Sequence, residues 1–335
     1  MAGSEGSTLG EGIRSGLHPR GAAGAGPGPR GVDLGPDILR MVHYFDIFHH
    51  PLTRAELTRL VAPGQPDRVE QSCALLAQQA AVSLEGPWCA APGRGYTIAR
   101  RKARSIQAER IWPKARAAAA VLGRLPFVEG LFVTGSLSKN SMSADGDVDF
   151  LVLVSPGRVW TLKAALQLLR RPLPRAAHEL MCTNYLLSTD SLVLDEQNLF
   201  TAMELVTAVP MVGRRACVSF LEANGWAADW IPGWSWSLER ARRLPPDRRA
   251  PGTAPSAAGR ALEATCLRTW DAYWDRKYSF LDRAVRARRF KRREDVATNH
   301  LHDFQGFVLT EVARRLEAAG LPMAPGSDAA VEPAA

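Results

Sequence analysis

Two acidic residues precede an apolar run in a pattern that is suited to metal chemistry. Asp147 and Asp149 flank Val148, and residues 150–154 continue as an uninterrupted apolar stretch. If this stretch is a β-strand, alternation places both carboxylates on one face, about 7 Å apart. The two carboxylates then repel each other and lose hydration, and a divalent cation relieves both costs. Ligation by oxygen alone favours Mg²⁺ or Mn²⁺.

A glycine-serine pair ends the preceding apolar run, ten residues before the acidic pair. Gly135 can adopt backbone conformations closed to other residues and lets a ligand approach the chain closely. Ser136 is placed to cap a short helix, whose free N–H groups favour phosphate. Lys139 is a candidate phosphate contact, with a surface position as the alternative. A phosphate cradle and a metal-binding acid pair on adjacent strands predict phosphoryl or nucleotidyl transfer.

The combined pattern resembles a known family. Gly-Ser, a ten-residue spacer and Asp-x-Asp before a hydrophobic strand are similar to the polymerase-beta-like nucleotidyltransferase superfamily, which includes antibiotic nucleotidyltransferases and poly(A) and CCA-adding enzymes. The motif covers Gly135 to Asp149, and flanking strands extend the resemblance to residues 125–215. A plain turn followed by solvated loop acids is the alternative interpretation.

The resemblance implies an α+β fold with a mixed sheet flanked by helices. It implies transfer of an NMP from an NTP, with ATP as the first candidate, to a hydroxyl acceptor that the sequence does not identify. Asp147 and Asp149 would be catalytic and would bind Mg²⁺ or Mn²⁺, while Gly135, Ser136 and Lys139 would bind the nucleotide. Nucleic acid is a weaker candidate partner, and no membrane partner is expected.

The chain departs from the family pattern at the third carboxylate. In the superfamily this group usually comes from the neighbouring strand, here predicted at 182–187, where the inward polar residue is Asn184. Asparagine can offer a carbonyl oxygen to a metal, but it carries no charge and cannot act as a general base. Glu179 is the alternative if the strand begins earlier. A catalytically degenerate nucleotide-binding, regulatory or assembly protein therefore remains the second hypothesis.

The N-terminal part predicts a separate small domain over residues 38–99. Apolar spacing indicates three helices, the second opened by a capping box at Thr53 and Glu56. Strands at 82–84 and 96–98, joined through glycines 93 and 95, complete a winged-helix-like pattern. Its third helix carries few basic residues, which favours a protein contact over DNA binding.

The rest of the chain is assigned by composition and helical spacing. Residues 100–124 predict a linker helix, kinked or broken at Pro113. Its basic residues face either a triphosphate or nucleic-acid backbone, or solvent: Arg101, Lys102, Arg104 and Arg110. Residues 195–212 predict one further helix, with Glu204 exposed or paired with an arginine. The remaining segments are a Trp-rich segment and linker at 216–260, a helical region at 261–320, and disordered tails at 1–37 and 321–335.

Bulk properties limit the class of protein. The net charge of +8 suits an anionic partner, although an arginine-rich composition contributes to it. Five scattered cysteines without CxxC spacing indicate reduced thiols instead of a zinc site or a disulfide framework. No apolar run approaches the length of a membrane span, and the N-terminus lacks a signal-peptide core, so a cytoplasmic location is expected.

Overall fold

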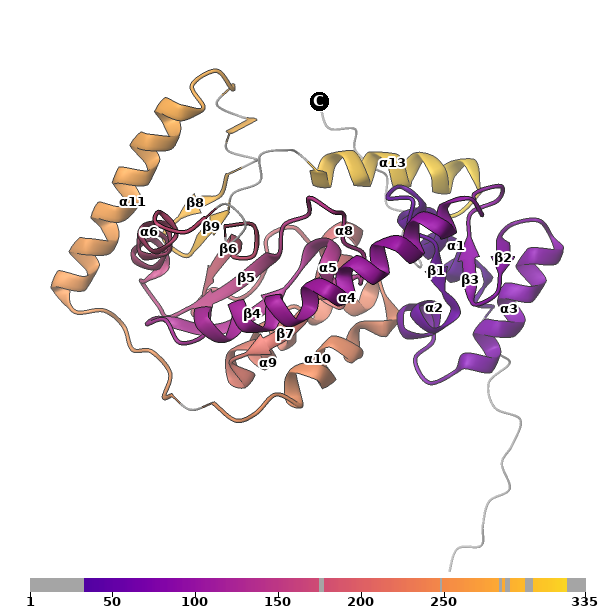
Figure 1. The fold of residues 1–335 in the computed structure, drawn as a ribbon, viewed down its shortest axis with the longest axis horizontal. Helices are drawn as coiled ribbons and strands as arrows, with labels where there is room; N and C mark the ends of the chain where they lie inside the picture. Colours follow the sequence, from indigo (N-terminus) through magenta and orange to yellow (C-terminus); the bar gives the residue numbers. More distant parts are fainter. Residues whose placement is uncertain are drawn as a thin grey trace, which may run out of the picture. The chain divides into compact units, whose positions relative to one another are not determined.

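The structure is a computed structural model that describes residues 33–174, 178–247, 249–282, 285–286, 290–298 and 304–323 (Figure 1). The chain from Leu34 onward forms one compact unit. It is an α+β structure with two sheets, a mixed six-stranded sheet and a smaller antiparallel sheet. The α+β class is as predicted.

The six-stranded sheet has the strand order β7-β4-β5-β6-β9-β8. Its strands are β4 (Val128–Val133), β5 (Asp149–Val154), β6 (Cys182–Ser188), β7 (Val209–Val212), β8 (Arg292–Arg293) and β9 (Val296–Thr298). The β5–β6 pair is parallel, and the other neighbouring pairs are antiparallel. The two apolar runs and the third strand predicted from the sequence are therefore neighbours in space.

Alternation along β5 divides its side chains between two cores. Leu151 and Leu153 belong to the core on the side of α8 (Leu199–Thr207) and α9 (Arg214–Ala223). Phe150, Val152 and Val154 belong to the core on the opposite side, which includes residues of α4 (Thr97–Leu122) and α6 (Val159–Arg170). A strand buried on both faces needs no polar positions, which explains its continuous apolar sequence.

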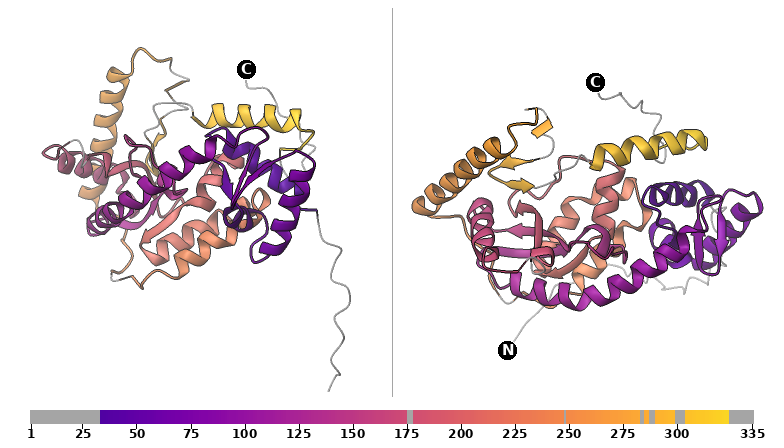
Figure 2. Two further views of the ribbon diagram at one scale, coloured as in Figure 1. Left: turned by 45° about the vertical axis from the view of Figure 1, so that its right-hand side comes forward. Right: turned by 45° about the horizontal axis from the view of Figure 1, so that its top comes forward.

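Helix α4 is one element of 26 residues that continues through Pro113. Its buried alanines, Ala108, Ala115 and Ala119, lie in the same core as Val133. These small side chains let the helix lie close to the sheet, as the ribbon views indicate (Figure 2). The predicted linker helix is thus a packed part of the main unit.

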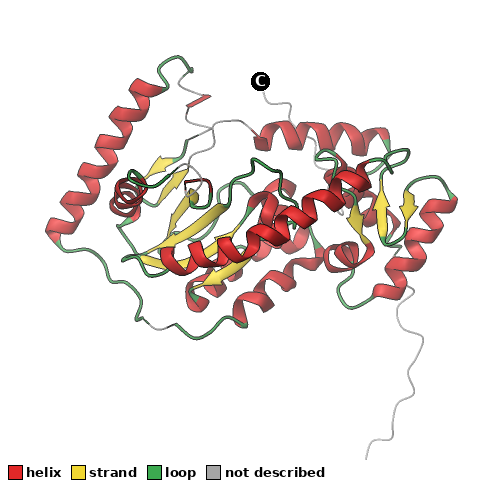
Figure 3. Ribbon diagram, in the orientation of Figure 1, coloured by secondary structure: helices red, strands yellow, loops and turns green. Residues whose placement is uncertain are grey.

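The N-terminal part contains α1 (Gly35–Asp46), β1 (Leu52–Thr53), α2 (Arg54–Val61), α3 (Pro66–Gln78), β2 (Ser83–Glu85) and β3 (Trp88–Ala90). The three short strands form an antiparallel sheet in the order β1-β3-β2 (Figure 3). The predicted capping box is present: Thr53 and Glu56 exchange side-chain and backbone hydrogen bonds at the start of α2.

The predicted second wing strand at 96–98 is wrong. The hairpin turns at Gly86-Pro87, so that Glu85 pairs with Trp88, and Thr97 already begins α4. Gly86 has a φ of +54°, which suits a two-residue hairpin turn. Gly93 also has positive φ, but it lies in the turn that leads into α4.

The sequence also missed three strands of the large sheet. The helix predicted at 195–212 is α8 followed by β7, because the residue before Pro210 disfavours helical backbone. The region predicted as helical at 261–320 contains α11 (Ala257–Lys277) and α13 (Phe304–Ala318), and the short strands β8 and β9 lie between them. These strands have only two and three residues, too few for a period to be recognised.

The predicted tails fall mainly outside the described residues. At the N-terminal side, Gly35–Asp46 is already helical, so the folded chain begins before residue 38. The densely basic run at 283–293 is described only in part. No described helix combines the length and the apolar character that a membrane span requires.

Candidate nucleotide and metal site

The strand ends that carry the residues singled out in the sequence lie together at one end of the large sheet. Strand β4 ends at Val133, beside the start of its antiparallel neighbour β5, and β6 begins next to it in parallel. The backbone N–H of Thr134 donates to the carbonyl oxygen of Asp149 at 2.9 Å. This bond fixes the turn that follows β4 beside the first residue of β5.

A glycine is required at position 135 because the Asp149 carboxylate packs against it. Its φ is +65°, in the left-handed region. A Cβ atom added at Gly135 would lie 2.3 Å from the Oδ2 atom of Asp149. The carboxylate therefore packs directly on the glycine backbone, where any side chain would displace it.

Asn184 lies next to Asp149, at the position where the family resemblance implies a third ligand. Its Nδ2 atom donates to Asp149 Oδ1 at 2.5 Å, and its Oδ1 atom accepts a hydrogen bond from Cys182 Sγ at 3.0 Å. The β5–β6 register shifts here, since Phe150 pairs with Thr183 and Leu151 with Tyr185. Asn184 is thus the extra residue of a bulge, a feature that re-aims side chains at sites.

The carboxyl group of Asp149 holds its proton unusually strongly. Its pKa rises from 3.8 to about 7, first through burial and then through the nearby charges of Glu204 and Asp147. The hydrogen bond from Asn184 and the charge of Lys139 oppose this rise only in part. The site therefore carries more negative charge than its environment stabilises, a condition that a bound cation would relieve.

Glu204 is the site residue that sequence reasoning missed. It lies on α8 and pairs with Lys139, whose Nζ atom is 2.8 Å from Glu204 Oε1 and 3.1 Å from the carbonyl oxygen of Gly135. The expected arginine partner is therefore a lysine. The sequence feature that could have identified Glu204 is its position as a charged residue between the buried Met203 and Leu205.

The other predicted residues lie around this centre with less contact. Asp147 and Ser136 are exposed. Ser136 lies inside the short helix α5 (Gly135–Ser138), whose N-cap is Thr134, so the predicted capping role of Ser136 is wrong. Asp147 precedes β5, so strand alternation does not place the two carboxylates on one face. The backbone N–H of Val148, between the two aspartates, donates to the carbonyl oxygen of Glu179 at 2.8 Å. The structure thus brings the chain at Glu179 beside the acidic pair.

A buried arginine connects the N-terminal part to this site. Arg101 is 2% exposed, and its guanidinium donates to Glu56 Oε1 at 2.9 Å and to His50 Nε2 at 3.1 Å. It also donates to the carbonyl oxygens of Asn140, at 2.9 Å, and Lys139, at 3.3 Å. The expectation that Arg101 faces solvent or a triphosphate is wrong, because its guanidinium is buried and bound by protein groups. These groups lie far away in the sequence, so the sequence did not reveal them.

The donor set fits a hard divalent cation that is completed by its substrate. Within the described part of the chain, no three His, Cys, Asp or Glu side chains converge on a preformed metal site. Mg²⁺ commonly uses one or two carboxylates together with substrate phosphates. Asp147, Asp149 and the amide oxygen of Asn184, once that amide rotates, provide such a partial set.

Stability should report the raised pKa of Asp149. The unfolded chain ionises near its ordinary value of 3.8 and the folded chain near about 7, so the free energy of unfolding should fall across this pH range. Relative to Asp149→Asn, the wild type should lose stability from pH 3.8 to about 7 and then level off. Urea unfolding at a series of pH values measures this difference. A difference that does not change with pH would contradict the assignment, and Asp145→Asn, at an exposed position of the same loop, is the control.

Comparisons with protein-family models, curated proteins and solved structures find no match to this chain.

Proposed function

We propose that the protein is a nucleotidyltransferase that moves an NMP from an NTP, ATP first among them, to a hydroxyl acceptor and releases pyrophosphate. The observation that carries the proposal is the convergence at one sheet end of the Gly135 turn, the Asp149 carboxylate and Asn184. The sequence resemblance to polymerase-beta-like nucleotidyltransferases supports the same activity.

Each residue of the site has a role in this proposal. Asp147 and Asp149 hold Mg²⁺ or Mn²⁺, which when bound stabilises negative charge on the phosphate oxygens. Gly135 lets the Asp149 carboxylate pack against this segment, and Ser136, exposed on the same segment, contributes to phosphate binding. Lys139, fixed by Glu204, brings a positive charge to this turn and contributes to phosphate binding.

A second candidate function is nucleotide binding without transfer. The observation that favours it is Asn184, whose amide faces Asp149 where a carboxylate would otherwise complete the site. An amide cannot accept the proton of an attacking hydroxyl. In this case the N-terminal helices and small sheet, which have a winged-helix-like order of elements, would serve as a contact module for regulation or assembly.

Equilibrium binding of Mg²⁺ and NTP tests the site that both candidates share. We expect wild-type protein to bind at least one NTP only when Mg²⁺ or Mn²⁺ is present, and the Asp147→Asn/Asp149→Asn double variant to lose this binding. Asp145→Asn should bind as the wild type does, because Asp145 lies in the same exposed loop without being part of the proposed site. Metal-independent binding, or equal binding by the double variant, would contradict the site assignment.

A further inference from the structure

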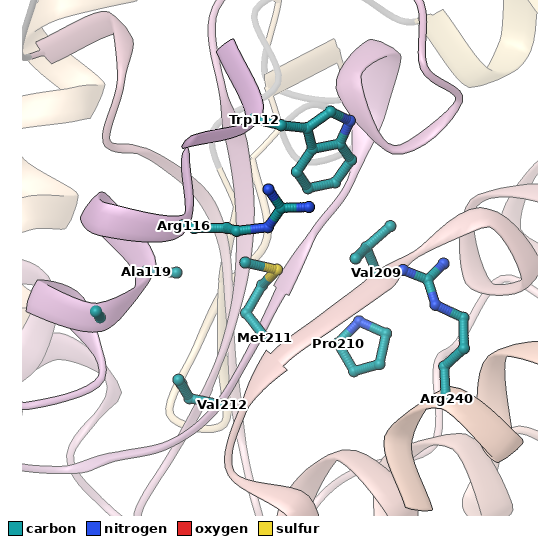
Figure 4. A pocket seen from close by; sticks show the side chains of 9 residues that line it. Trp112, Arg116, Ala119, Val209, Pro210, Met211, Val212 and Arg240 are labelled. Carbon is teal, nitrogen blue, oxygen red and sulfur yellow. The ribbon is translucent and has the colours of Figure 1, made fainter. Parts of the chain in front are cut away.

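A pocket of about 550 Å³ lies away from the acidic site, between α4, the edge strand β7 and α10 (Ser235–Arg242). Trp112 and Arg116 line it from α4, Val209 and Met211 from β7, and Arg240 from α10 (Figure 4). Among the described strands, β7 pairs only with β4 and is therefore an edge strand of the sheet. The volume lies within the range of small-molecule sites, roughly 300–1,000 Å³.

Two guanidinium groups border this pocket without a carboxylate to neutralise them. Within the described residues, no acidic side chain lies within ion-pair distance of Arg116 or Arg240. Each is held by an indole ring instead: Arg116 lies 5.5 Å from the ring centre of Trp112, and Arg240 lies 4.4 Å from that of Trp236. Stacking on an aromatic face fixes a guanidinium while leaving its N–H groups available to a ligand.

Arg240 is a partly buried cation with a second cation close to it. Burial and the charge of Arg59 lower the pKa of Arg240 to about 10, so the group stays protonated at neutral pH. Arg59 stacks on the same Trp236 ring at 5.5 Å, which adds a further positive charge nearby. A partly buried cation without a counter-ion is costly, and an anionic ligand offsets that cost.

The remaining walls of the pocket are apolar. Val209 and Pro210 are buried residues of β7, and the Met211 side chain lies between Arg116 and the strand in Figure 4. Apolar and aromatic walls with a guanidinium group on each of two opposite sides suit a ligand with a planar apolar body and one strongly anionic group. A phosphomonoester carries a charge of about −1.5 to −2 at neutral pH, which complements two arginines.

We propose that this pocket binds a small phosphomonoester carried on a planar ring, such as an aryl or nucleoside monophosphate, at a site separate from the acidic end of the sheet. Arg116 and Arg240 bind the phosphate, and Trp112 and Met211 contact the ring. The proposal needs no metal and does not depend on the proposed transferase activity.

Calorimetric titration with phenyl phosphate in the presence of EDTA tests the proposal. We expect one site per chain, and a loss of affinity on the order of tenfold or more in both Arg116→Gln and Arg240→Gln, as expected for a charge-assisted hydrogen bond. Arg110→Gln, at an exposed position of the same helix, should bind as the wild type does. The Asp147→Asn/Asp149→Asn variant should also bind normally, which separates this site from the transfer site.

Three results would overturn the proposal. They are no binding at millimolar phenyl phosphate, binding that both arginine substitutions leave unchanged, and inorganic phosphate binding as tightly as phenyl phosphate. AMP then tests whether a nucleoside can replace the phenyl ring, and weaker binding of AMP than of phenyl phosphate would restrict the ligand to aryl phosphates. Arg116 is exposed, so its substitution should leave folding intact even if Arg240→Gln does not.

Discussion

Replacement of Arg101 with methionine is expected to destabilise the protein by about 3 kcal/mol, because it removes the buried partner of an ion pair and leaves several hydrogen-bonding groups unsatisfied. The substitution removes hydrogen bonds to the Glu56 carboxylate and to two backbone carbonyl oxygens. It also leaves the imidazole of His50 without its donor in a fully buried position. Burial, followed by the charge of Arg101, lowers the pKa of His50, so this ring is neutral and accepts the bond.

Lys102→Met is the matched control for this prediction. Lys102 is the next residue on α4, and its Nζ atom lies 3.6 Å from Glu85 Oε1 with both side chains more than half exposed. An exposed pair of this kind contributes only about 0–1 kcal/mol. Urea unfolding should therefore separate the two variants clearly. Equal losses of unfolding free energy would show that Arg101 does not join the N-terminal part to the sheet as described.

Gly135→Ala is expected to lower stability and to abolish metal-dependent nucleotide binding. An alanine there must adopt a φ of +65° and place its Cβ atom 2.3 Å from Asp149 Oδ2. The left-handed backbone alone costs roughly 1–2 kcal/mol for a residue with a Cβ atom. Displacement of the carboxylate adds to this cost and disturbs the proposed metal site.

Gly93→Ala measures the cost of a left-handed backbone conformation without a steric clash. Gly93 has a φ of +70°, and no atom lies within 4 Å of an added Cβ. Gly135→Ala should therefore destabilise the protein more than Gly93→Ala does. When Asp149 is also replaced with alanine, the extra destabilisation of Gly135→Ala over Gly93→Ala should disappear, since the clashing atom is gone. Denaturant titration of both glycine variants, each with and without Asp149→Ala, measures this coupling. Extra destabilisation that persists with Asp149→Ala would locate the strain elsewhere.

The sequence predicted the three strands that border the candidate site. Continuous apolar runs marked β4, β5 and β6, because strands buried on both faces need no polar positions. Gly135 was predicted from its backbone freedom and Asn184 from its place in the third strand, and both lie beside Asp149. The strands and Gly135 required only a short stretch of chain, whereas the position of Asn184 also required the family resemblance.

The features that the sequence did not predict depend on contacts between distant segments. Glu204 and Lys139 are 65 residues apart and meet only because α8 packs beside the Gly135 turn. Arg101 and His50 are 51 residues apart, and a basic helix with many arginines gives no sign of which one is buried. No local period could assign these partners, because the fold alone brings them together.

Transfer of label from α-³²P-labelled NTP tests the central claim most directly. With Mg²⁺ and a hydroxyl acceptor pool, wild-type protein should move the α-label to an acceptor and release pyrophosphate, while γ-³²P-labelled NTP should label only the pyrophosphate. The Asp147→Asn/Asp149→Asn variant should neither transfer the α-label nor release pyrophosphate. Release of inorganic phosphate from the γ-labelled substrate, or α-label transfer that the double variant retains, would contradict nucleotidyl transfer at this site.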